Sequence, residues 1–319
     1  MLTGAERKVE GSLYGHREAM GAKPSHAQSL IAAPREDNQY DKKTAEFFDI
    51  FNEDTGRPEL YYGYMAGFLR QAEPSAAEGA CARKRIAVDF GCGTGWLTKR
   101  LPSLGFTDVY GIDTSPDMLK MAFSKTPNNL ISKGIVRYNN KVPTSILGQC
   151  ELVSMVHVHY HFQPFENLQN NLFGAVSSML APNGHAILVG CPSNHVADTP
   201  EHYQNCIHIN DVPPAILEAA SNPEILGDDD GYIALSCLPR FALKDGTPMK
   251  VTFNALDRNG LPCFASLMDT HWSDEALVKA AQGAGLELIG RENLMWRSHP
   301  NAYMMMHFKK ANKIHSLHA

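Results

Sequence analysis

A glycine-rich turn at residues 91–95 constrains the fold of this chain more than any other feature of the sequence. The turn reads Gly-Cys-Gly-Thr-Gly and follows a short apolar segment, residues 85–88. Eighteen residues beyond Gly95, a second apolar segment ends in Asp113. Glycines let the backbone bend sharply or approach a ligand that a side chain would obstruct, and an acid that ends the next strand can bind two ribose hydroxyls. This pairing predicts a site for a nucleoside-containing cofactor.

The spacing of the glycines separates two classes of cofactor. A dinucleotide-binding turn has two residues between its second and third glycines, and Trp96 fills the place of that third glycine here. A bulky side chain at a helix start would hinder a pyrophosphate from settling on the N-terminal amides, whereas a cofactor without phosphates makes no such demand. The turn therefore favours a phosphate-free cofactor, with NAD as the alternative.

The segment 86–119 resembles the first motif of class I S-adenosylmethionine-dependent methyltransferases. In that family, the acid that opens the motif and the three glycines surround the methionine portion of the cofactor, and the acid after the second strand binds the ribose. The resemblance covers roughly residues 39–310 and implies S-adenosyl-L-methionine as the cofactor. The residues that it assigns to the cofactor in this motif are Asp89, Gly91, Gly93, Gly95, Asp113 and Thr114.

Two further cofactor contacts follow from the resemblance. Many members of the family carry an acid at the end of the third strand to receive the adenine amino group, whereas this chain has Asn139 and Asn140 there. An amide oxygen can accept the same hydrogen bond. Tyr40 precedes a segment that looks like the N-terminal cap helix of small-molecule methyltransferases, where an aromatic side chain can close over the cofactor. Ordinary packing is the alternative for Tyr40.

Alternating strand and helix patterns predict an α/β fold with a Rossmann-like, doubly wound and mainly parallel sheet of seven strands. The resemblance implies that the last strand runs antiparallel. Strands are expected at 85–90, 108–112, 134–138, 151–156, 185–190, 286–291 and 302–308, and core helices at 95–104, 115–125, 164–181 and from Ser273 onward.

The chain divides into a core and several additions. The N-terminal segment reads either as a flexible leader or as a helix that caps the site or swaps between subunits. The insertion contains a predicted β-hairpin on either side of the turn 257–260, placed over the active site. The expected parts are the leader at 1–38, N-terminal cap helices at 39–80, the cofactor-binding core at 81–191 and 273–310, a substrate lid at 192–272, and a tail at 311–319.

Composition argues against several classes of partner. The net charge of -5 provides no basic field that would attract nucleic acid. No stretch approaches the roughly eighteen apolar residues of a membrane span. The seven cysteines are scattered without a C-x-x-C pair, which favours a reducing, cytoplasmic compartment over a disulfide framework. The acidic run 228–230 has no nearby histidine, so we read it as a solvated loop and predict no metal.

Candidate catalytic groups follow the fourth predicted strand. His157, His159 and His161 lie at the carboxyl edge of the sheet, where open α/β folds place their ligands. A histidine titrates near neutral pH, so one of them could take the proton from an attacking hydroxyl or amine. His157 is preferred because it directly follows the strand, and His271, after the hairpin, is the second candidate base. A metal site and structural polarity are the alternatives.

The sequence thus predicts an S-adenosylmethionine-dependent methyltransferase that acts on an oxygen, nitrogen or activated carbon of a small-molecule, natural-product acceptor. Three alternatives stay open: C-methylation of an alkene coupled to cyclisation, a non-catalytic cofactor-binding or regulatory protein, and an NAD-dependent oxidoreductase. We also expect a homo-oligomer, and the leader and the cap helices either exchange between subunits or stay within one subunit.

Overall fold

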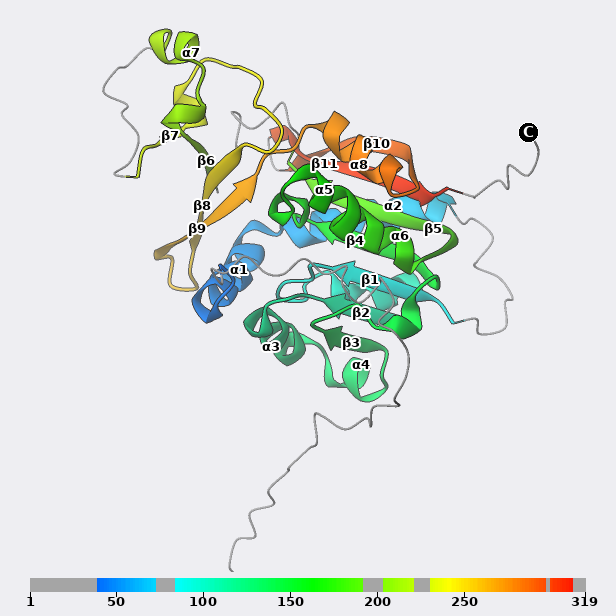
Figure 1. Ribbon diagram of the computed structural model, residues 1–319. Coiled ribbons are helices and arrows are strands. Elements are labelled where there is room, and N and C mark those ends of the chain that lie inside the picture. The colour runs from blue at the N-terminus through cyan, green and yellow to red at the C-terminus, as the bar shows by residue number, and fades with distance from the viewer. Residues whose placement is uncertain (1–38, 73–83, 192–202, 221–229, 297–298, 312–319) are drawn as a thin grey trace, which may run out of the picture.

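The computed structural model describes residues 39–72, 84–191, 203–220, 230–296 and 299–311. The predicted leader at 1–38, most of the predicted tail, and Asp228 and Asp229 of the acidic run lie outside the described residues. In the described part, a central sheet carries helices on both faces, and a second, smaller sheet stands beside it (Figure 1).

The central sheet has seven strands in the order β10-β11-β5-β4-β1-β2-β3. The pairs β3–β2, β2–β1, β1–β4 and β4–β5 are parallel, whereas β11 runs antiparallel to both β5 and β10. This arrangement confirms the predicted Rossmann-like, mainly parallel sheet with an antiparallel last strand. The strands are β1 (Ile86–Phe90), β2 (Asp108–Ile112), β3 (Val136–Asn139), β4 (Cys150–Val156), β5 (Leu180–Gly190), β10 (Leu286–Trp296) and β11 (His299–Lys310).

Several helices begin at polar residues that cap them. The side chains of Asp41, Ser115 and Ser273 each accept a hydrogen bond from the backbone amide three residues later, at 2.9, 3.2 and 3.1 Å. The α-helices are α1 (Lys42–Thr55), α2 (Arg57–Ala72), α3 (Pro116–Lys125), α4 (Asn128–Ser132), α5 (Phe165–Asn167), α6 (Gly174–Met179), α7 (Pro214–Glu218) and α8 (Asp274–Gly283). Short 3₁₀ helices occupy Thr98–Leu104, Thr144–Ile146, His159–His161, Ile209–Asp211 and Leu235–Cys237.

The segment after the glycine-rich turn differs from its predicted form. We expected an α-helix over 95–104, and the structure has a 3₁₀ helix over Thr98–Leu104 instead. Pro102 lies inside this segment and has no amide hydrogen to donate, and Gly105 ends it in the left-handed conformation. A short 3₁₀ segment therefore replaces the longer helix.

The predicted helix 164–181 is interrupted and ends earlier than expected. It consists of α5, a π-helical stretch at Leu168–Phe173, and α6, which ends at Met179. Leu180 already belongs to β5, where it pairs with Cys150 of β4. Pairing with β4 therefore places residues 180 and 181 in a strand, although the apolar periodicity alone predicted a helix there.

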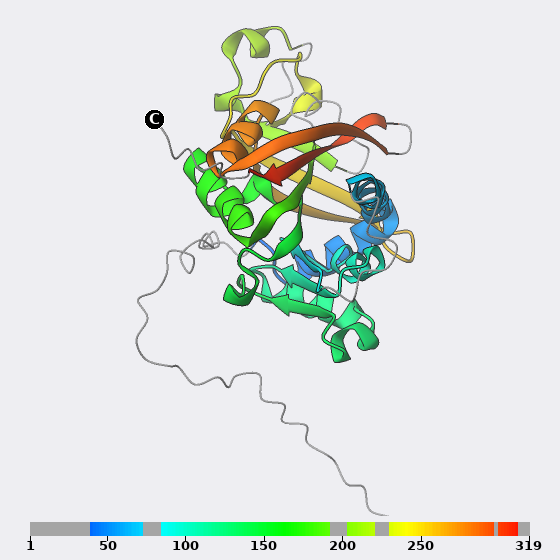
Figure 2. The same ribbon diagram turned by 90° about the vertical axis from the view of Figure 1, so that its right-hand side faces the viewer.

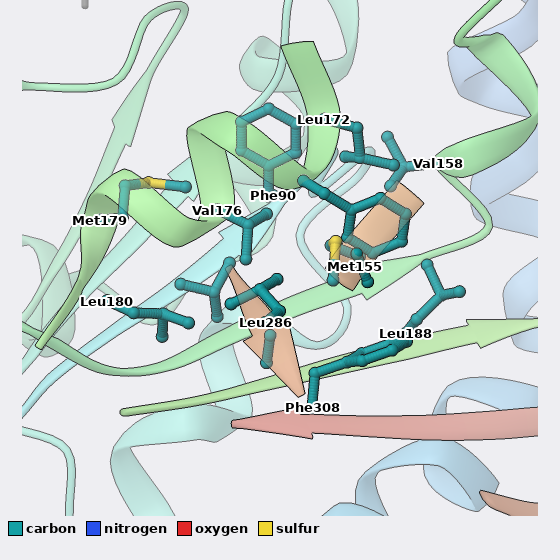
Figure 3. Packing of buried hydrophobic residues seen from close by; sticks show 14 of the residues in the cluster. Phe90, Met155, Val158, Leu172, Val176, Met179, Leu180, Leu188, Leu286 and Phe308 are labelled. Carbon is teal, nitrogen blue, oxygen red and sulfur yellow. The ribbon is translucent and has the colours of Figure 1, made fainter. Parts of the chain in front are cut away.

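The hydrophobic core fills both sides of the central sheet. All residues of β1 are buried, as expected for a parallel strand that is covered on both faces. Phe90, Met155 and Phe308 pack with Leu172 and Val176 of the interrupted helix on one face (Figure 3). The opposite face packs against α2, and Figure 2 shows α2 on the other side of the sheet from α5 and α6.

The smaller sheet has four antiparallel strands in the order β7-β6-β8-β9. The strands β8 (Pro248–Leu256) and β9 (Pro262–Thr270) form the predicted hairpin. The strands β6 (Tyr203–His208) and β7 (Tyr232–Ala234) extend it, and sequence analysis did not predict them. We call these four strands the lid sheet.

The helix α1 lies against the lid sheet and connects it to the core (Figure 1). Phe47 and Phe51 of α1 pack with Ala255 of β8. Arg258, in the turn of the hairpin, forms an ion pair with Glu53 of α1 at 3.0 Å. The N-terminal cap and the lid thus share one interface beside the carboxyl edge of the central sheet.

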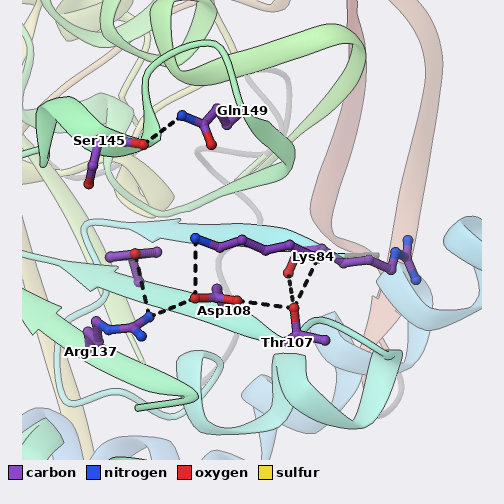
Figure 4. Close-up of polar contacts among 8 residues, drawn as sticks. Lys84, Thr107, Asp108, Arg137, Ser145 and Gln149 are labelled. Carbon is purple, nitrogen blue, oxygen red and sulfur yellow. Dashed lines mark hydrogen bonds and ion pairs between the residues drawn. The ribbon is translucent and has the colours of Figure 1, made fainter. Parts of the chain in front are cut away.

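A polar cluster marks the opposite edge of the sheet (Figure 4). The carboxylate of Asp108, at the start of β2, lies 3.0 Å from a guanidinium nitrogen of Arg137 and 3.6 Å from the Lys84 ammonium. The Thr107 hydroxyl donates to the other Asp108 oxygen at 3.1 Å. These side chains lie at the amino ends of the parallel strands and do not line the cavity described below.

Candidate functional site

A cavity of about 710 Å³ opens at the carboxyl edge of the central sheet. Its wall combines the glycine-rich turn, the N-terminal cap and the lid sheet, which are far apart in the sequence. Tyr40 comes from the cap, Gly91 from the turn, His157 from the segment after β4, and Phe253 and Asp269 from the lid sheet. The volume falls within the range of roughly 300–1,000 Å³ that is typical of small-molecule sites.

The glycine-rich turn depends on backbone conformations and close packing that other residues tolerate poorly. Gly91 has φ 72°, and a Cβ atom there would lie 2.6 Å from a methyl group of Val158. Gly95 has φ 76°, and a Cβ atom there would lie 2.6 Å from the Tyr138 hydroxyl. Gly91 and Gly93 line the cavity, whereas Gly95 lies behind the wall and packs the turn against β3 and α3.

Asp89, in the strand that leads into the turn, is buried and fully engaged in hydrogen bonds. It is 2% exposed, and its carboxylate accepts hydrogen bonds from the hydroxyls of Thr98 at 2.6 Å and Ser154 at 3.0 Å. Burial raises the pKa of Asp89 to about 6, and the two hydrogen bonds act in the opposite direction. Asp89 therefore connects β1 to the following 3₁₀ helix and to β4, and it also reaches the cavity wall.

Asp113 is held in one orientation at the end of β2. Its two carboxylate oxygens accept hydrogen bonds from the backbone amides of Gly93 at 2.8 Å and Ser115 at 2.9 Å. Burial raises its pKa, and these amide contacts act in the opposite direction. Asp113 and the neighbouring Thr114 line the cavity. Each carboxylate oxygen keeps a lone pair for a further donor, such as a ribose hydroxyl.

Of the two amides predicted to receive the adenine amino group, only Asn140 lines the cavity. The side-chain oxygen of Asn139 is buried and accepts no hydrogen bond from the described residues. Asn139 is the last residue of β3, so the following residue is the one that reaches the carboxyl edge. The geometry therefore favours Asn140 for this contact.

Tyr40 closes one side of the cavity. Its hydroxyl lies 2.8 Å from Nε2 of His161, and its backbone carbonyl accepts a hydrogen bond from the Ser115 hydroxyl at 2.6 Å. The second contact ties the segment before α1 to the residue that caps α3, two positions beyond Asp113. Tyr40 and Asp113 both line the cavity, and the cap role of Tyr40 stays a prediction.

The two predicted bases both face the cavity as neutral rings. His157 has φ 55°, and its Nε2 lies 2.8 Å from the Tyr61 hydroxyl. Burial, with the charge of Arg57 as the next cause, lowers its pKa well below 6.5. Burial also lowers the pKa of His271, although Asp245 and Asp274 raise it in part. A neutral imidazole can accept a proton.

The other two histidines after β4 have different surroundings. His159 is 1% exposed and lies outside the cavity wall, and burial lowers its pKa to about 3. His161 lines the cavity, and its Nδ1 lies 3.7 Å from a carboxylate oxygen of Asp269 on β9. The sequence placed the segment 269–272 at the end of the hairpin, where it could face the cavity, but gave Asp269 no role. The only signal was its position two residues before His271, which places both on one face of the extended chain.

The described residues show neither a metal centre nor a membrane span. No group of three or more histidine, cysteine, aspartate or glutamate side chains in this part of the chain is arranged to hold a metal ion. No helix in the same residues is long and apolar enough to cross a membrane.

Comparisons with known proteins agree with this architecture. A family model described as a methyltransferase domain matches residues 59–290. A curated relative, a ribosomal protein L11 methyltransferase from Vibrio campbellii, is 22% identical over 129 residues, which span 40% of this chain and 41% of the relative's own length.

Two solved structures resemble the fold at low sequence identity. An S-adenosylmethionine-dependent methyltransferase from Clostridium acetobutylicum is 14% identical, with 84% of this chain and 98% of that chain covered and a TM-score of 0.53. A magnesium protoporphyrin IX methyltransferase from Synechocystis is also 14% identical, with 85% and 100% covered and a TM-score of 0.49.

Proposed function

Because the chain belongs to the methyltransferase-domain family whose model spans residues 59–290, we propose that it methylates an oxygen, nitrogen or activated carbon of a small-molecule acceptor. S-adenosylmethionine is the cofactor expected for this family and fold. The proposal rests on one observation: the cavity runs continuously from the glycine-rich turn to the lid sheet. A cofactor on the turn and an acceptor under the lid would then share one cavity.

The residues on the wall have separate tasks in this proposal. Asp113 would hold the ribose hydroxyls, Asn140 would accept from the adenine amino group, and the turn would lie against the methionine portion. Bound S-adenosylmethionine supplies a methyl group on a positive sulfur, which is a good leaving group. The protein then has to align the acceptor with that methyl group and exclude water, and a cavity lined by the cap and the lid sheet would help with both.

An oxygen or nitrogen acceptor also has to lose a proton, and His161 is the best-placed base. The carboxylate of Asp269 lies on the Nδ1 side of its ring, so it would stabilise the imidazolium that forms. The contact between Tyr40 and Nε2 shows that a hydroxyl fits at the other ring nitrogen. At His157 the nearby Arg57 opposes protonation. His161 is therefore favoured over His157, and His271 is the next candidate.

The cavity favours a small acceptor, such as an intermediate of natural-product biosynthesis, over nucleic acid. The chain has a net charge of -5, which gives no general attraction to phosphates. None of the findings supports the alternative of a non-catalytic protein or that of an NAD-dependent oxidoreductase. Methylation of an alkene followed by cyclisation has no specific support either.

Calorimetric titration with S-adenosylhomocysteine, the product of the cofactor, tests this function. We expect binding to the wild type and a loss of at least about tenfold in Asp113→Ala, because two hydrogen bonds to a charged group disappear. Asp108→Ala is the matched control, since Asp108 begins the same strand outside the cavity. Binding of NADH but not of S-adenosylhomocysteine would overturn the proposal.

A further inference from the structure

A row of aromatic rings runs along the wall of the cavity from the lid sheet to the candidate base. The ring of Phe253 on β8 meets that of Phe48 on α1 edge to face, with the ring centroids 5.2 Å apart. The Tyr40 ring lies 6.0 Å from Phe48 and meets the His161 ring edge to face at 5.3 Å. All four side chains line the cavity, and we call them the aromatic row. The row ends at the imidazole that the proposed function uses as the base.

The face of the lid sheet that lines the cavity is mostly apolar. Side chains two positions apart on a strand share a face, and Met249, Val251 and Phe253 of β8 all line the cavity. On β9, Leu267 lies opposite Val251, and Asp269 lies opposite Met249. Among the described residues of this sheet, Asp269 is the only charged one on the cavity wall. A ligand under the lid therefore meets carbon along most of the sheet and one charge beside the candidate base.

Acceptors that carry many hydroxyl groups, such as sugars, fit this wall poorly. The lid face offers two polar side chains to the cavity, Asn205 and Asp269. Asn167 and Asn171 also line the cavity, but they form a hydrogen bond with each other at 3.0 Å. A sugar would lose more hydrogen bonds to water than these side chains replace. A flat aromatic ring has no such loss at its carbon atoms, and its edges and faces match those of the aromatic row.

The end of the aromatic row indicates where the reacting group of the acceptor lies. The Tyr40 hydroxyl is 2.8 Å from Nε2 of His161, so the chain itself places a phenol at the base. On the other side of the ring, Nδ1 lies 3.7 Å from a carboxylate oxygen of Asp269. A phenol is a far stronger acid than an aliphatic alcohol, so an imidazole takes its proton more readily. An aromatic acceptor with a phenolic hydroxyl matches both the wall and the base.

We propose that the acceptor is a phenol, which binds between the aromatic row and the apolar face of the lid sheet with its hydroxyl group at His161. The proposal rests on the proposed function and names the acceptor class for it. The acceptor hydroxyl takes the place of the Tyr40 hydroxyl, and its proton moves to Nε2 of His161 as its O–H bond breaks. The phenol oxygen forms a bond to the methyl carbon of S-adenosylmethionine, and the electron pair of the broken carbon–sulfur bond stays on sulfur. The products are a methyl ether and S-adenosylhomocysteine, and the imidazolium beside Asp269 then releases its proton to water.

The test uses 2-naphthol as the acceptor probe and decahydro-2-naphthol, its saturated form, as the matched ligand. Binding of each to the protein loaded with S-adenosylhomocysteine is measured calorimetrically. The variants are Phe253→Leu, in the aromatic row, and His161→Asn, at the base. Phe264→Leu is the control, because Phe264 lies on the same hairpin, is 64% exposed and does not line the cavity. Circular dichroism and melting temperatures establish that each variant is folded.

The wild type should bind 2-naphthol about tenfold more tightly than its saturated form, since only a flat ring meets the row edge to face. Phe253→Leu should reduce this preference by about 2- to 10-fold, the range expected for the loss of one aromatic pair. Phe264→Leu should leave the preference unchanged. With S-adenosylmethionine, the wild type should convert 2-naphthol into 2-methoxynaphthalene, and His161→Asn should bind the probe but convert it at least about 100-fold more slowly.

Three results would overturn parts of this proposal. Equal binding of 2-naphthol and its saturated form by the wild type, or binding of neither, would overturn the aromatic site. An unchanged preference in a folded Phe253→Leu would overturn the role of the aromatic row. Binding of 2-naphthol without conversion, or conversion by His161→Asn at the wild-type rate, would overturn the placement of the hydroxyl group at His161.

The proposed function can fail separately from the acceptor class. Failure of the wild type to bind S-adenosylhomocysteine would count against the proposed function. Titration of the two naphthol probes into the unloaded protein would still test the aromatic site in that case.

Discussion

A buried histidine on β11 predicts a loss of stability in mild acid. His307 is 4% exposed, and its ring centroid lies 3.4 Å from that of Phe68 on α2. Burial, with the charge of His185 as the second cause, lowers the pKa of His307 from 6.5 to about 3. The folded protein therefore keeps this ring neutral at pH values where the unfolded chain protonates it.

The size of the effect follows from that difference in pKa. A group whose pKa is lower in the folded protein contributes stability above its unfolded pKa and loses it as the pH falls. For His307 the loss begins near 6.5 and continues toward about 3, at about 1.36 kcal/mol per pH unit. Between pH 7 and pH 5, this one histidine should lower the free energy of unfolding by roughly 2 kcal/mol.

Urea denaturation of the wild type and of His307→Leu at pH 7 and pH 5 measures this contribution. The variant should lose about 2 kcal/mol less than the wild type between the two pH values, whatever its stability at pH 7. Phe68→Leu is the control, because it disturbs the same contact without removing a titratable group. It should leave the pH dependence unchanged. An equal pH dependence in the wild type and His307→Leu would refute the argument.

Three further predictions concern the cavity and its supports. With an oxygen or nitrogen acceptor in hand, His161→Asn should lower kcat by about 10²- to 10⁴-fold and remove the acidic limb of the pH–rate profile. Asp269→Asn should give a smaller loss of the same kind. Unchanged kcat in both variants would exclude the pair as the base. Gly91→Ala should lower the free energy of unfolding by about 1–3 kcal/mol, since its Cβ atom would meet Val158; a urea midpoint equal to that of the wild type would contradict this contact. Asp49→Asn should lower the free energy of unfolding by about 1–3 kcal/mol in the same assay, because the buried carboxylate pairs with Lys125 and accepts a hydrogen bond from the Trp96 indole at 3.3 Å. An effect below a few tenths of a kcal/mol would mean that these contacts do not hold α1 against the core.

Local sequence patterns were sufficient to predict most of the strands and helices of the core. The apolar segments predict the seven strands of the central sheet, and capping residues such as Ser115 and Ser273 mark the starts of α3 and α8. These signals work because a strand, a helix start or a glycine turn is decided by a few consecutive residues. The same signals failed where a partner strand competed, as at Leu180, which pairs with β4 and ends the helix before it.

Local sequence patterns did not predict the two strands that complete the lid sheet. The hairpin β8–β9 is visible in the sequence because its strands are joined by a short turn. The strand β6 pairs with β8 of that hairpin, which begins 40 residues after β6 ends (208 to 248), and β7 pairs in turn with β6. Their formation depends on that pairing rather than on their own composition.

The sequence by itself determined the glycine-rich turn and the acid that follows the next strand. Both features depend on the backbone conformation of a few consecutive residues. Only the tertiary structure decided which side chains meet across the cavity. Tyr40 and His161 are 121 positions apart, Tyr61 and His157 are 96 apart, and Asp269 reaches the cavity from the lid sheet. Such contacts form only when the cap and the lid pack against the same edge of the central sheet. The residue pattern within the cap or within the lid carries no information about how close the two segments lie in space.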